Sequence, residues 1–351
     1  MKAGVFRGER DVRVEEVADP VLRDPDDAIV RIVRSSVCGS DLWPYRGHAP
    51  WQPGWRTGHE LTGIVEEVGD AVEHVRPGDL VVSAFAWSCG TCEFCRAGLQ
   101  TSCVRSTYPG GADNDGGQGE LVRLPMVDGS VWKVPDGTPE DRLDAVHLLS
   151  DVLLTGYHAA KLAGVGEPGI DGEPVRTAVV VGDGAVGLSA VVSAKLLGAT
   201  TIVAAGHHAE RLELAAQLGA TVTTDLRGDE LHRHLLDLTD GGAAAVMECV
   251  GTAGAVATAV EVARPGGTVS MVGVPRFVDE WPMGTFFSKN VAFRAGVAPV
   301  RAYMDEVGPA VASGELDVSA IASHRFTLDE LPDAYAAMDE RRCIKAIVVP
   351  E

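Results

Sequence analysis

The sequence predicts a two-domain α/β protein in which a β-rich domain is joined to a domain of alternating strands and helices. Its 351 residues are enough for about two domains of ordinary size. Near residue 151 short β-type runs give way to apolar strands that alternate with Ala- and Leu-rich helical stretches. Apolar residues make up 46% and charged residues 23% of the chain, which argues against a disordered chain, a coiled coil or a collagen-like protein.

The first part of the chain, to about residue 135, shows no long helical period. Gly, Pro and Asp break it into short β-type runs, of which the clearest are 28–33, 63–68 and 80–84. This half is therefore expected to be mostly β.

The second part repeats a strand–helix unit. Glycines end its first two helices, and a Pro-Gly-Gly turn precedes its last strand. The predicted strands are 177–182, 201–205, 243–249 and 268–272, and the predicted helices are 185–197, 209–218 and 253–262. Such alternation builds a parallel sheet.

The pattern weakens beyond about residue 285, where helices are expected near 300–312 and 328–338 and a final strand at 344–349. A lone terminal strand needs a sheet to join, so this tail is expected to return to the first domain. The predicted domains are 1–151 with 285–351, and 152–284.

The charge balance excludes some partners. Fifty acidic against thirty basic side chains give a formal charge of −20, which repels phosphate backbones and anionic lipid headgroups. The chain has no run of 18 apolar residues, and its first residues become charged too early for a signal peptide. We therefore expect a cytoplasmic protein that binds neither nucleic acid nor membranes.

Four of the seven cysteines, Cys89, Cys92, Cys95 and Cys103, lie within one 15-residue segment. This spacing lets a short loop wrap a tetrahedral ion and leaves no position open for chemistry, which indicates a structural zinc. An iron–sulfur cluster is the alternative metal, but its bacterial motif is spaced more tightly and ends in Cys-Pro. Two local disulfides are the remaining alternative, which a reducing compartment disfavours.

A second metal site is suggested upstream, where Cys38 and His59 stand in different segments of the β-rich half. Either residue alone is more often an ordinary core or hydrogen-bonded side chain. Two ligands do not complete a zinc site, and Asp151 and Glu60 are the candidates for the third.

The segment Gly182-Asp183-Gly184-Ala185-Val186-Gly187 follows an apolar strand and opens a helix. Glycines there allow a tight turn and let a pyrophosphate approach the backbone amides and the helix N-terminus. With strand–helix units on both sides, this motif predicts a dinucleotide site. The charge of Asp183 is unwelcome near phosphate unless its side chain points away.

Taken together, these motifs resemble the zinc-dependent alcohol dehydrogenases of the medium-chain dehydrogenase/reductase family. The resemblance rests on Gly58-His59-Glu60, on Gly63 and Val65, on Gly78-Asp79, on the four-cysteine loop and on the glycine-rich turn, in that order along the chain. It implies a GroES-like catalytic domain and a Rossmann domain with a doubly wound parallel sheet, with substrate and nicotinamide meeting in the cleft between them.

The resemblance implies that Cys38, His59 and Asp151 bind a catalytic zinc. It makes Glu60 either a neighbour of the ligands or a ligand that swings in when water or substrate leaves. Ser40 would hydrogen-bond the alcohol oxygen and pass its proton toward solvent.

Further roles follow from the same resemblance. Asp41 would hold His59 in its ligating tautomer. Trp43 stands where one branch of the family has a relay histidine, so Tyr45, His48 or the cofactor ribose with water would continue the proton path. The residues expected to wall an apolar substrate pocket are Trp43, Phe85 and Trp87, which could equally be core aromatics.

The cofactor expected is NADP(H) in preference to NAD(H). No Asp or Glu ends the second strand, where Gly206 stands and a ribose-reading carboxylate is usual, and His207, His208 and Arg211 could bind a 2′-phosphate. The alternative is that these histidines form only a solvated turn. The residues expected to bind the cofactor are Gly182, Gly184, Ala185, Val186, Gly187, Gly206, His207, His208, Arg211, Cys249, Val250, Val272, Val274, Gly296, Val297, Ala298 and Lys345, the last as a pyrophosphate contact.

The predicted function is zinc-dependent hydride transfer between a nicotinamide cofactor and an alcohol, aldehyde or ketone, with two zinc ions per chain. A polyol or sugar dehydrogenase and a non-catalytic NADP(H)-binding member are the alternatives. A zinc-free quinone or enoyl reductase is disfavoured because the zinc motifs are intact. By family analogy the chain is expected to form a homodimer or homotetramer.

Overall fold

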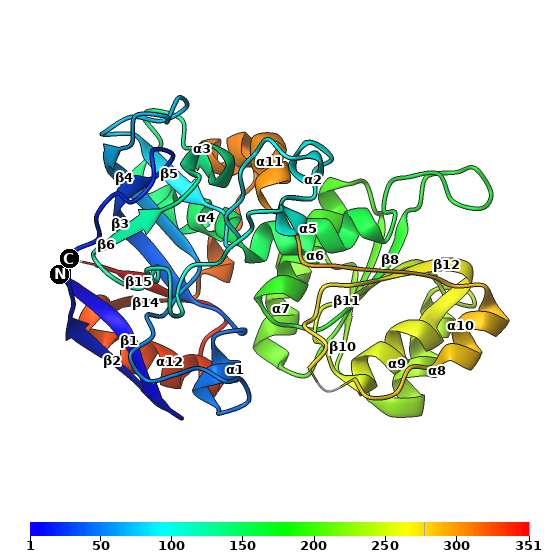
Figure 1. Ribbon diagram of the computed structural model, residues 1–351. Coiled ribbons are helices and arrows are strands. Elements are labelled where there is room, and N and C mark those ends of the chain that lie inside the picture. The colour runs from blue at the N-terminus through cyan, green and yellow to red at the C-terminus, as the bar shows by residue number, and fades with distance from the viewer. Residues whose placement is uncertain (277, 351) are drawn as a thin grey trace. The chain divides into compact units, whose positions relative to one another are not determined.

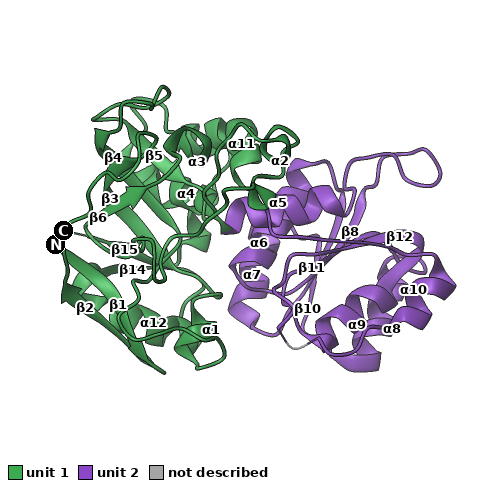
Figure 2. Ribbon diagram, viewed as in Figure 1, with its two compact units in different colours: residues 1–151, 299–351 green, residues 152–298 purple. Residues whose placement is uncertain are grey.

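The computed structural model describes residues 1–276 and 278–350 and divides the chain into two compact units (Figure 1). Unit 1 comprises Met1–Asp151 and Pro299–Glu351, and unit 2 comprises Val152–Ala298 (Figure 2). The chain returns to unit 1 at Pro299, later than the expected position 285, because two further elements belong to unit 2. Among the described residues no helix combines the length and apolar character of a membrane span.

Unit 1 is built on a seven-stranded sheet and a separate two-stranded ribbon, β1–β2. The sheet runs β14-β15-β3-β4-β5-β7, and β6 pairs with β3 outside this path. The strands of unit 1, in both sheets, are β1 (Lys2–Gly8), β2 (Asp11–Glu16), β3 (Ala28–Val37), β4 (Leu61–Val68), β5 (Leu80–Ser83), β6 (Leu121–Leu124), β7 (Val131–Lys133), β14 (His324–Thr327) and β15 (Ala346–Val349).

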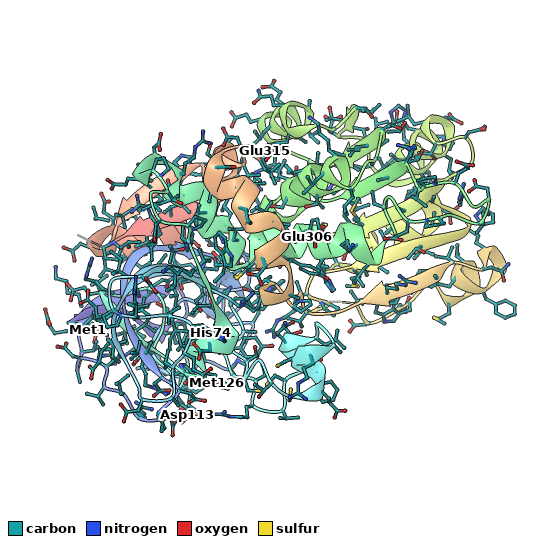
Figure 3. All side chains as sticks on the ribbon, turned by 90° about the horizontal axis from the view of Figure 1, so that it is seen from above. Met1, His74, Asp113, Met126, Glu306 and Glu315 are labelled. Carbon is teal, nitrogen blue, oxygen red and sulfur yellow. The ribbon has the colours of Figure 1, made fainter. Side chains whose placement is uncertain are left out.

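The helices of unit 1 are mostly short. They are α1 (Leu42–Tyr45), α2 (Glu93–Arg96), α3 (Val127–Ser130), α4 (Leu143–His147), α11 (Arg301–Ser313) and α12 (Leu331–Asp339), with 3₁₀ turns η1 (Gln100–Ser102), η2 (Glu140–Arg142), η3 (Leu148–Ser150), η4 (Ser319–Ile321) and η5 (Leu328–Glu330). Acidic side chains such as Glu306 on α11 and Glu315 just beyond it are exposed (Figure 3), as expected for a strongly acidic chain.

The C-terminal strand completes the sheet of unit 1. β15 pairs antiparallel with β3, with Ala346 opposite Val37 and Val348 opposite Ser35. On its other side β3 pairs with β4, with Ser35 opposite Leu61. This register brings the residues just before β4 and β15 to the end of β3. The polar centre described below is built there.

Unit 2 holds a six-stranded parallel sheet in the order β10-β9-β8-β11-β12-β13. This is the doubly wound order 3-2-1-4-5-6 of dinucleotide-binding domains. Its strands are β8 (Thr177–Val181), β9 (Thr201–Ala205), β10 (Val222–Thr224), β11 (Ala243–Glu248), β12 (Ala263–Met271) and β13 (Ala292–Ala295), and its helices are α5 (Val152–Leu162), α6 (Ala185–Leu196), α7 (Ala209–Leu218), α8 (Gly228–Leu238), α9 (Ala253–Val262) and α10 (Met283–Lys289).

The sheet of unit 2 forms one side of a packed apolar core. Val179, Val203, Val246 and Val269, one from each of four neighbouring strands, are fully buried. Valine suits such positions because a parallel sheet is covered on both faces and β-branched side chains pack well on pleated strands. The sequence patterns did not predict α5, β10, α8, α10 and β13. All of these except α5 have apolar patterns that are short or interrupted by polar residues.

Candidate metal centres and cofactor site

The four clustered cysteines converge on one point in the loop around α2. The Cys92 and Cys95 sulfurs are 3.5 Å apart, as are those of Cys103 and Cys89, and the sulfurs of Cys89 and Cys95 are 4.0 Å apart. Four thiolates around zinc at about 2.3 Å lie roughly 3.8 Å from one another. Backbone amides of Cys89 and Arg105 donate to the Cys103 sulfur. The loop therefore fits one tetrahedral metal ion and not two disulfides.

The electrostatics of this loop also favour a cation. Burial opposes ionisation of Cys89, but hydrogen bonds from Thr91, the Cys92 amide and Cys103 outweigh it and lower the pKa of that thiol to about 6. Burial and the sulfurs of Cys92 and Cys103 raise the pKa of Cys95 to about 12. Without a metal the four thiols cannot all ionise, and a divalent ion would relieve that conflict.

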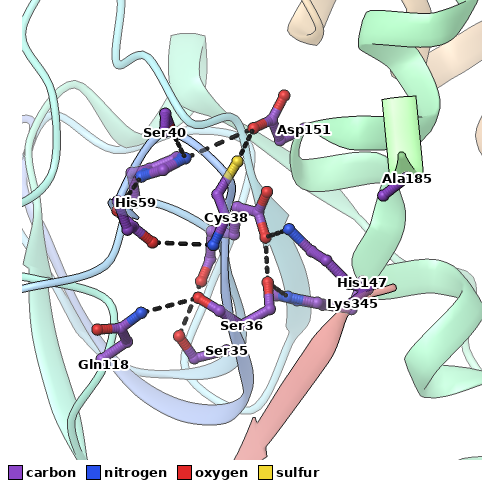
Figure 4. A network of polar contacts seen from close by, with 12 residues as sticks. Ser35, Ser36, Cys38, Ser40, His59, Gln118, His147, Asp151, Ala185 and Lys345 are labelled. Carbon is purple, nitrogen blue, oxygen red and sulfur yellow. Dashed lines mark hydrogen bonds and ion pairs between the residues drawn. The ribbon is translucent and has the colours of Figure 1, made fainter. Parts of the chain in front are cut away.

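A second cluster lies at the end of β3 and contains Cys38, His59, Glu60 and Asp151, whose ligand atoms all lie within 4.8 Å of one another. Oδ2 of Asp151 is 3.5 Å from the Cys38 sulfur and 3.5 Å from Nε2 of His59 (Figure 4). Tetrahedral zinc bonds of about 2.0 to 2.3 Å place ligand atoms roughly 3.3 to 3.8 Å apart. The three residues expected to bind catalytic zinc are thus arranged as such a site requires, within unit 1 alone.

Asp41 accepts hydrogen bonds from two of the candidate ligands, Cys38 and His59. Its Oδ1 accepts a hydrogen bond from Nδ1 of His59 at 3.0 Å, and its Oδ2 accepts one from the backbone N–H of Cys38 at 2.9 Å. With a proton on Nδ1, the Nε2 lone pair of His59 faces the cluster and is available to a metal.

Charge at this centre also matches a cation. Burial lowers the pKa of His59, but the carboxylates of Asp41 and Asp151 outweigh it and raise that pKa well above its usual value. Burial raises the pKa of the Cys38 thiol, and Glu60 and Asp151 add to this increase, while Lys345 opposes it. The site holds protons where a metal ion would displace them.

The two carboxylate oxygens of Glu60 have different surroundings. Its Oε2 is paired with the ammonium of Lys345 and accepts a hydrogen bond from Ser36, whereas its buried Oε1 has no hydrogen-bond partner among the described residues. Lys345 is only 1% exposed. The expectation that Lys345 contacts the cofactor pyrophosphate is therefore not supported, because its ammonium is buried against Glu60.

Aromatic residues flank the second cluster. The ring of Phe85 packs edge-on to His59 at 6.3 Å and lies stacked with Tyr108 at 6.4 Å. Trp43 is half-buried, with its ring 6.2 Å from that of His48, and Ser40 Oγ is 3.4 Å from Nε2 of His59. Of the residues expected to line the substrate pocket or relay the proton, Phe85 and Ser40 therefore contact His59.

Two expected aromatic roles need correction. Trp87 is fully buried and its indole N–H donates to Ser83 Oγ at 2.9 Å, so it is a core residue and not a pocket wall. Tyr45 is buried with its ring 5.2 Å from that of Tyr335, so it belongs to an apolar core cluster of unit 1. His48 and the cofactor ribose with water remain as the expected continuation of the proton path.

The glycine-rich turn joins β8 to α6 with the geometry that the motif predicts. Gly182 has φ +122°, and a Cβ on Gly187 would lie 2.0 Å from the carbonyl oxygen of Gly182. A Cβ on Gly184 would meet no atom within 4 Å among the described residues. The N-terminus of the 12-residue helix α6 is thus open to an anionic group at Gly184 and Ala185.

Asp183 turns away from this opening and toward the end of β9. Its Oδ2 accepts hydrogen bonds from the backbone amides of His207 and His208, at 2.6 and 2.8 Å, and lies 2.9 Å from Nδ1 of His208. A Cβ on Gly206 would lie 2.6 Å from the Asp183 side chain. A carboxylate therefore does lie at the end of β9, although no Asp or Glu directly follows this strand in the sequence, and three donors compensate its charge.

The remaining expected cofactor residues lie at the carboxyl ends of β11, β12 and β13 in unit 2. Cys249 and Val250 follow β11 beside Gly182, Val272 and Val274 follow β12, and residues 296–298 follow β13. Ligands of doubly wound sheets bind at this edge, at the switch point between the first and fourth strands. In this sheet those strands are β8 and β11.

Comparison with known families agrees with both units. Residues 24–136 match the alcohol dehydrogenase GroES-like domain, and residues 185–310 match the zinc-binding dehydrogenase family. The chain belongs to the zinc-binding alcohol dehydrogenases. This membership confirms the predicted fold, a GroES-like β domain with a Rossmann-type parallel sheet, and the predicted zinc-type alcohol dehydrogenase class.

Relatives of this alcohol dehydrogenase match along its length. Zinc-type alcohol dehydrogenase B of Aspergillus flavus is 36% identical over 351 residues, covering 99% of this chain and 81% of the relative. The structure of alcohol dehydrogenase TADH from Thermus sp. ATN1 is 35% identical, covers all of both chains and has a TM-score of 0.89. A putative zinc-binding dehydrogenase of Sinorhizobium meliloti, solved bound to NADP, is 28% identical with a TM-score of 0.84 and covers 99% of each chain.

Sequence reasoning missed His147, Ser36 and Tyr108 near the second cluster. His147 lies at the end of α4 and hydrogen-bonds Ser36 Oγ at 2.8 Å, and Ser36 lies two residues before Cys38. No motif or spacing marks these residues. The one available signal was a polar residue, His147, between the apolar residues Val146 and Leu148.

We predict that Cys92→Ser removes one metal ion and lowers thermal stability while catalysis at 25 °C largely persists, because the cysteine loop lies apart from the Cys38 cluster. Thermal unfolding and metal content by plasma mass spectrometry check this. Ser102→Ala, in the same loop and without a metal-binding atom, is the control. Immediate loss of turnover in Cys92→Ser with an unchanged unfolding temperature would contradict the structural role.

Proposed function

We propose that this alcohol dehydrogenase interconverts medium-sized hydrophobic or aromatic alcohols with their aldehydes or ketones. The observation that carries this proposal is the convergence of Cys38, His59 and Asp151 beside the apolar ring of Phe85. Three protein ligands leave one tetrahedral position for a substrate oxygen. An adjoining aromatic surface favours an apolar substituent on the reacting carbon.

Each residue has a defined task in this reaction. Cys38, His59 and Asp151 would hold zinc, and Asp41 orients His59. Zinc bound there lowers the pKa of an alcohol and stabilises negative charge on its oxygen. Ser40, beside His59, accepts the hydroxyl proton from the alcohol and passes it toward His48 or the cofactor ribose. A bound nicotinamide would supply the hydride-transfer chemistry at the carbinol carbon.

Cys38→Ser and His59→Ala are each expected to lower kcat/KM by at least about a thousandfold, since the metal that carries several kcal/mol of charge stabilisation is lost. The test is a panel of aromatic, aliphatic and polyhydroxylated alcohols, aldehydes and ketones. Cys343→Ser, a buried cysteine outside both clusters, is the matched control. Near wild-type turnover in either variant would refute the catalytic site. Exclusive use of polyols would refute the substrate class and favour a polyol dehydrogenase.

We further propose that NADP(H) is the preferred cofactor. His207 is exposed and Arg211 half-exposed at the start of α7, next to the end of β9 where the adenosine ribose binds in this fold. The charge of Asp183 is countered by two amides and His208, and these hydrogen bonds order the turn that presents His207. The NADP-bound relative is consistent with this preference.

The ratio of kcat/KM for NADPH to that for NADH tests this assignment. We expect a ratio above one in the wild type and a decrease of about tenfold or more in His207→Ala/Arg211→Ala, the equivalent of one charge-assisted contact to phosphate. Glu213→Ala, an exposed position on the same helix, should leave the ratio unchanged. A wild-type preference for NADH would contradict the proposal and would identify Asp183 as the discriminating carboxylate.

We also propose a homodimer formed along β13. This strand is at the edge of the sheet, and its residues 292–295 are all exposed. Phe287 on the neighbouring helix α10 is 89% exposed and Met283 is 65% exposed. An open strand edge beside exposed apolar side chains suits antiparallel pairing with a second copy.

Light scattering should give twice the monomer mass of 36.8 kDa, or four times that mass if two dimers associate. Phe287→Asp should reduce the assembly by removing this interface. Ile170→Asp, at another strongly exposed apolar residue of unit 2, should not. A monomeric wild type at micromolar concentration would contradict the dimer.

A further inference from the structure

A run of buried polar side chains leads to one oxygen of Glu60 in unit 1. Oγ1 of Thr62 is 3.1 Å from Nδ1 of His147, and Nε2 of His147 is 2.8 Å from Oγ of Ser36. Ser36 contacts Oε2 of Glu60, which also pairs with Lys345 (Figure 4). All five side chains are at most 1% exposed. None of these contacts involves water-accessible surface.

The chemistry of the groups fixes the direction of every hydrogen bond in this run. Lys345 is a donor only, and Oε2 of the Glu60 carboxylate is an acceptor only. Ser36 therefore donates its single proton to Oε2 and accepts from Nε2–H of His147. Nδ1 of His147 is then unprotonated and accepts from the Thr62 hydroxyl.

A neutral His147 is required for this arrangement, and its surroundings supply that state. Burial lowers the pKa of His147 to about 3 against the opposing charge of Glu60, and the positive charges of Lys345 and Arg34 add smaller decreases. The imidazole is thus an uncharged donor locked in one tautomer. It acts on Glu60 only through Ser36.

Neighbouring side chains contact only one of the two carboxylate oxygens of Glu60. Oε2 accepts a hydrogen bond from Ser36 and is ion-paired with Lys345, while Oε1 is buried without a hydrogen-bond partner among the described residues. A Glu60 oxygen lies within 4.8 Å of the Cys38, His59 and Asp151 ligand atoms. A buried unpaired carboxylate oxygen is costly. A cation bound by Cys38, His59 and Asp151 would attract it.

We propose that Ser36 and His147 are positioning residues that hold the Glu60 carboxylate on Lys345 and thereby weaken its attraction to the catalytic metal. This inference rests on the proposed function, since it needs a metal at Cys38, His59 and Asp151. Removing the Ser36 donor leaves Oε2 with Lys345 alone. The carboxylate then shifts toward the metal, which gains an oxygen ligand and leaves more slowly.

The experiment compares Ser36→Ala with Ser35→Ala. Both serines are fully buried neighbours on β3, but Ser35 donates to the backbone carbonyl of Glu60 at 3.0 Å and not to its carboxylate. The readouts are the rate at which zinc passes from the loaded protein to a colorimetric chelator and the visible spectrum of the cobalt-substituted protein. Zinc release from the cysteine loop, which both variants should leave unchanged, is the internal reference.

We expect Ser36→Ala to slow release from the Cys38 site about tenfold, the equivalent of about 1.4 kcal/mol, and to alter the cobalt spectrum. Ser35→Ala should change neither. His147→Phe, which keeps a ring of similar shape and removes the donor to Ser36, should act in the same direction. In a Glu60→Gln background, adding Ser36→Ala should have no further effect, because the carboxylate charge that moves is already gone.

Equal release rates and identical cobalt spectra for Ser36→Ala and Ser35→Ala would overturn this inference and leave the proposed function intact. A wild-type chain that binds zinc only in the cysteine loop would overturn both. A Ser36→Ala effect that persists in the Glu60→Gln background would also contradict it, because the effect would then not pass through Glu60.

Discussion

One carboxylate organises the candidate catalytic centre. Asp41 accepts the Cys38 backbone N–H with one oxygen and the Nδ1 proton of His59 with the other, so a single side chain places a thiol and an imidazole from separate segments. The β-sheet supports this contact, since Cys38 follows β3 and His59 lies just before the paired strand β4. Without Asp41, neither the tautomer of His59 nor its orientation toward Cys38 is fixed.

The same strand pairing creates a buried ion pair beside the ligands. β15 returns from the C-terminal part of the chain to pair with β3 and brings Lys345 onto Glu60. Burying two charges is costly, and removing one partner of such a pair typically destabilises a fold by about 3 to 5 kcal/mol. The pair is better explained by its place next to the metal ligands than by any gain in stability.

Local sequence patterns predicted those parts of the molecule that depend on short segments. The cysteine spacing predicted the metal-binding loop. The glycine-rich turn after an apolar strand predicted the edge of the sheet where a dinucleotide would bind. The contacts of Lys345, His147 and Asp183 depend on residues 24 to 285 positions away, and no spacing encodes them. Trp87 was misassigned for the same reason, because burial of an aromatic ring depends on strands distant in sequence.

We expect this alcohol dehydrogenase to bind two metal ions per chain, of which one lies among Cys38, His59 and Asp151. Crystallography at the zinc absorption edge tests it most directly. We predict two anomalous peaks per chain, one within the cysteine loop and one within bonding distance of Cys38 Sγ, His59 Nε2 and an Asp151 oxygen. A single peak in the cysteine loop, in protein grown and crystallised with ample zinc, would contradict the account.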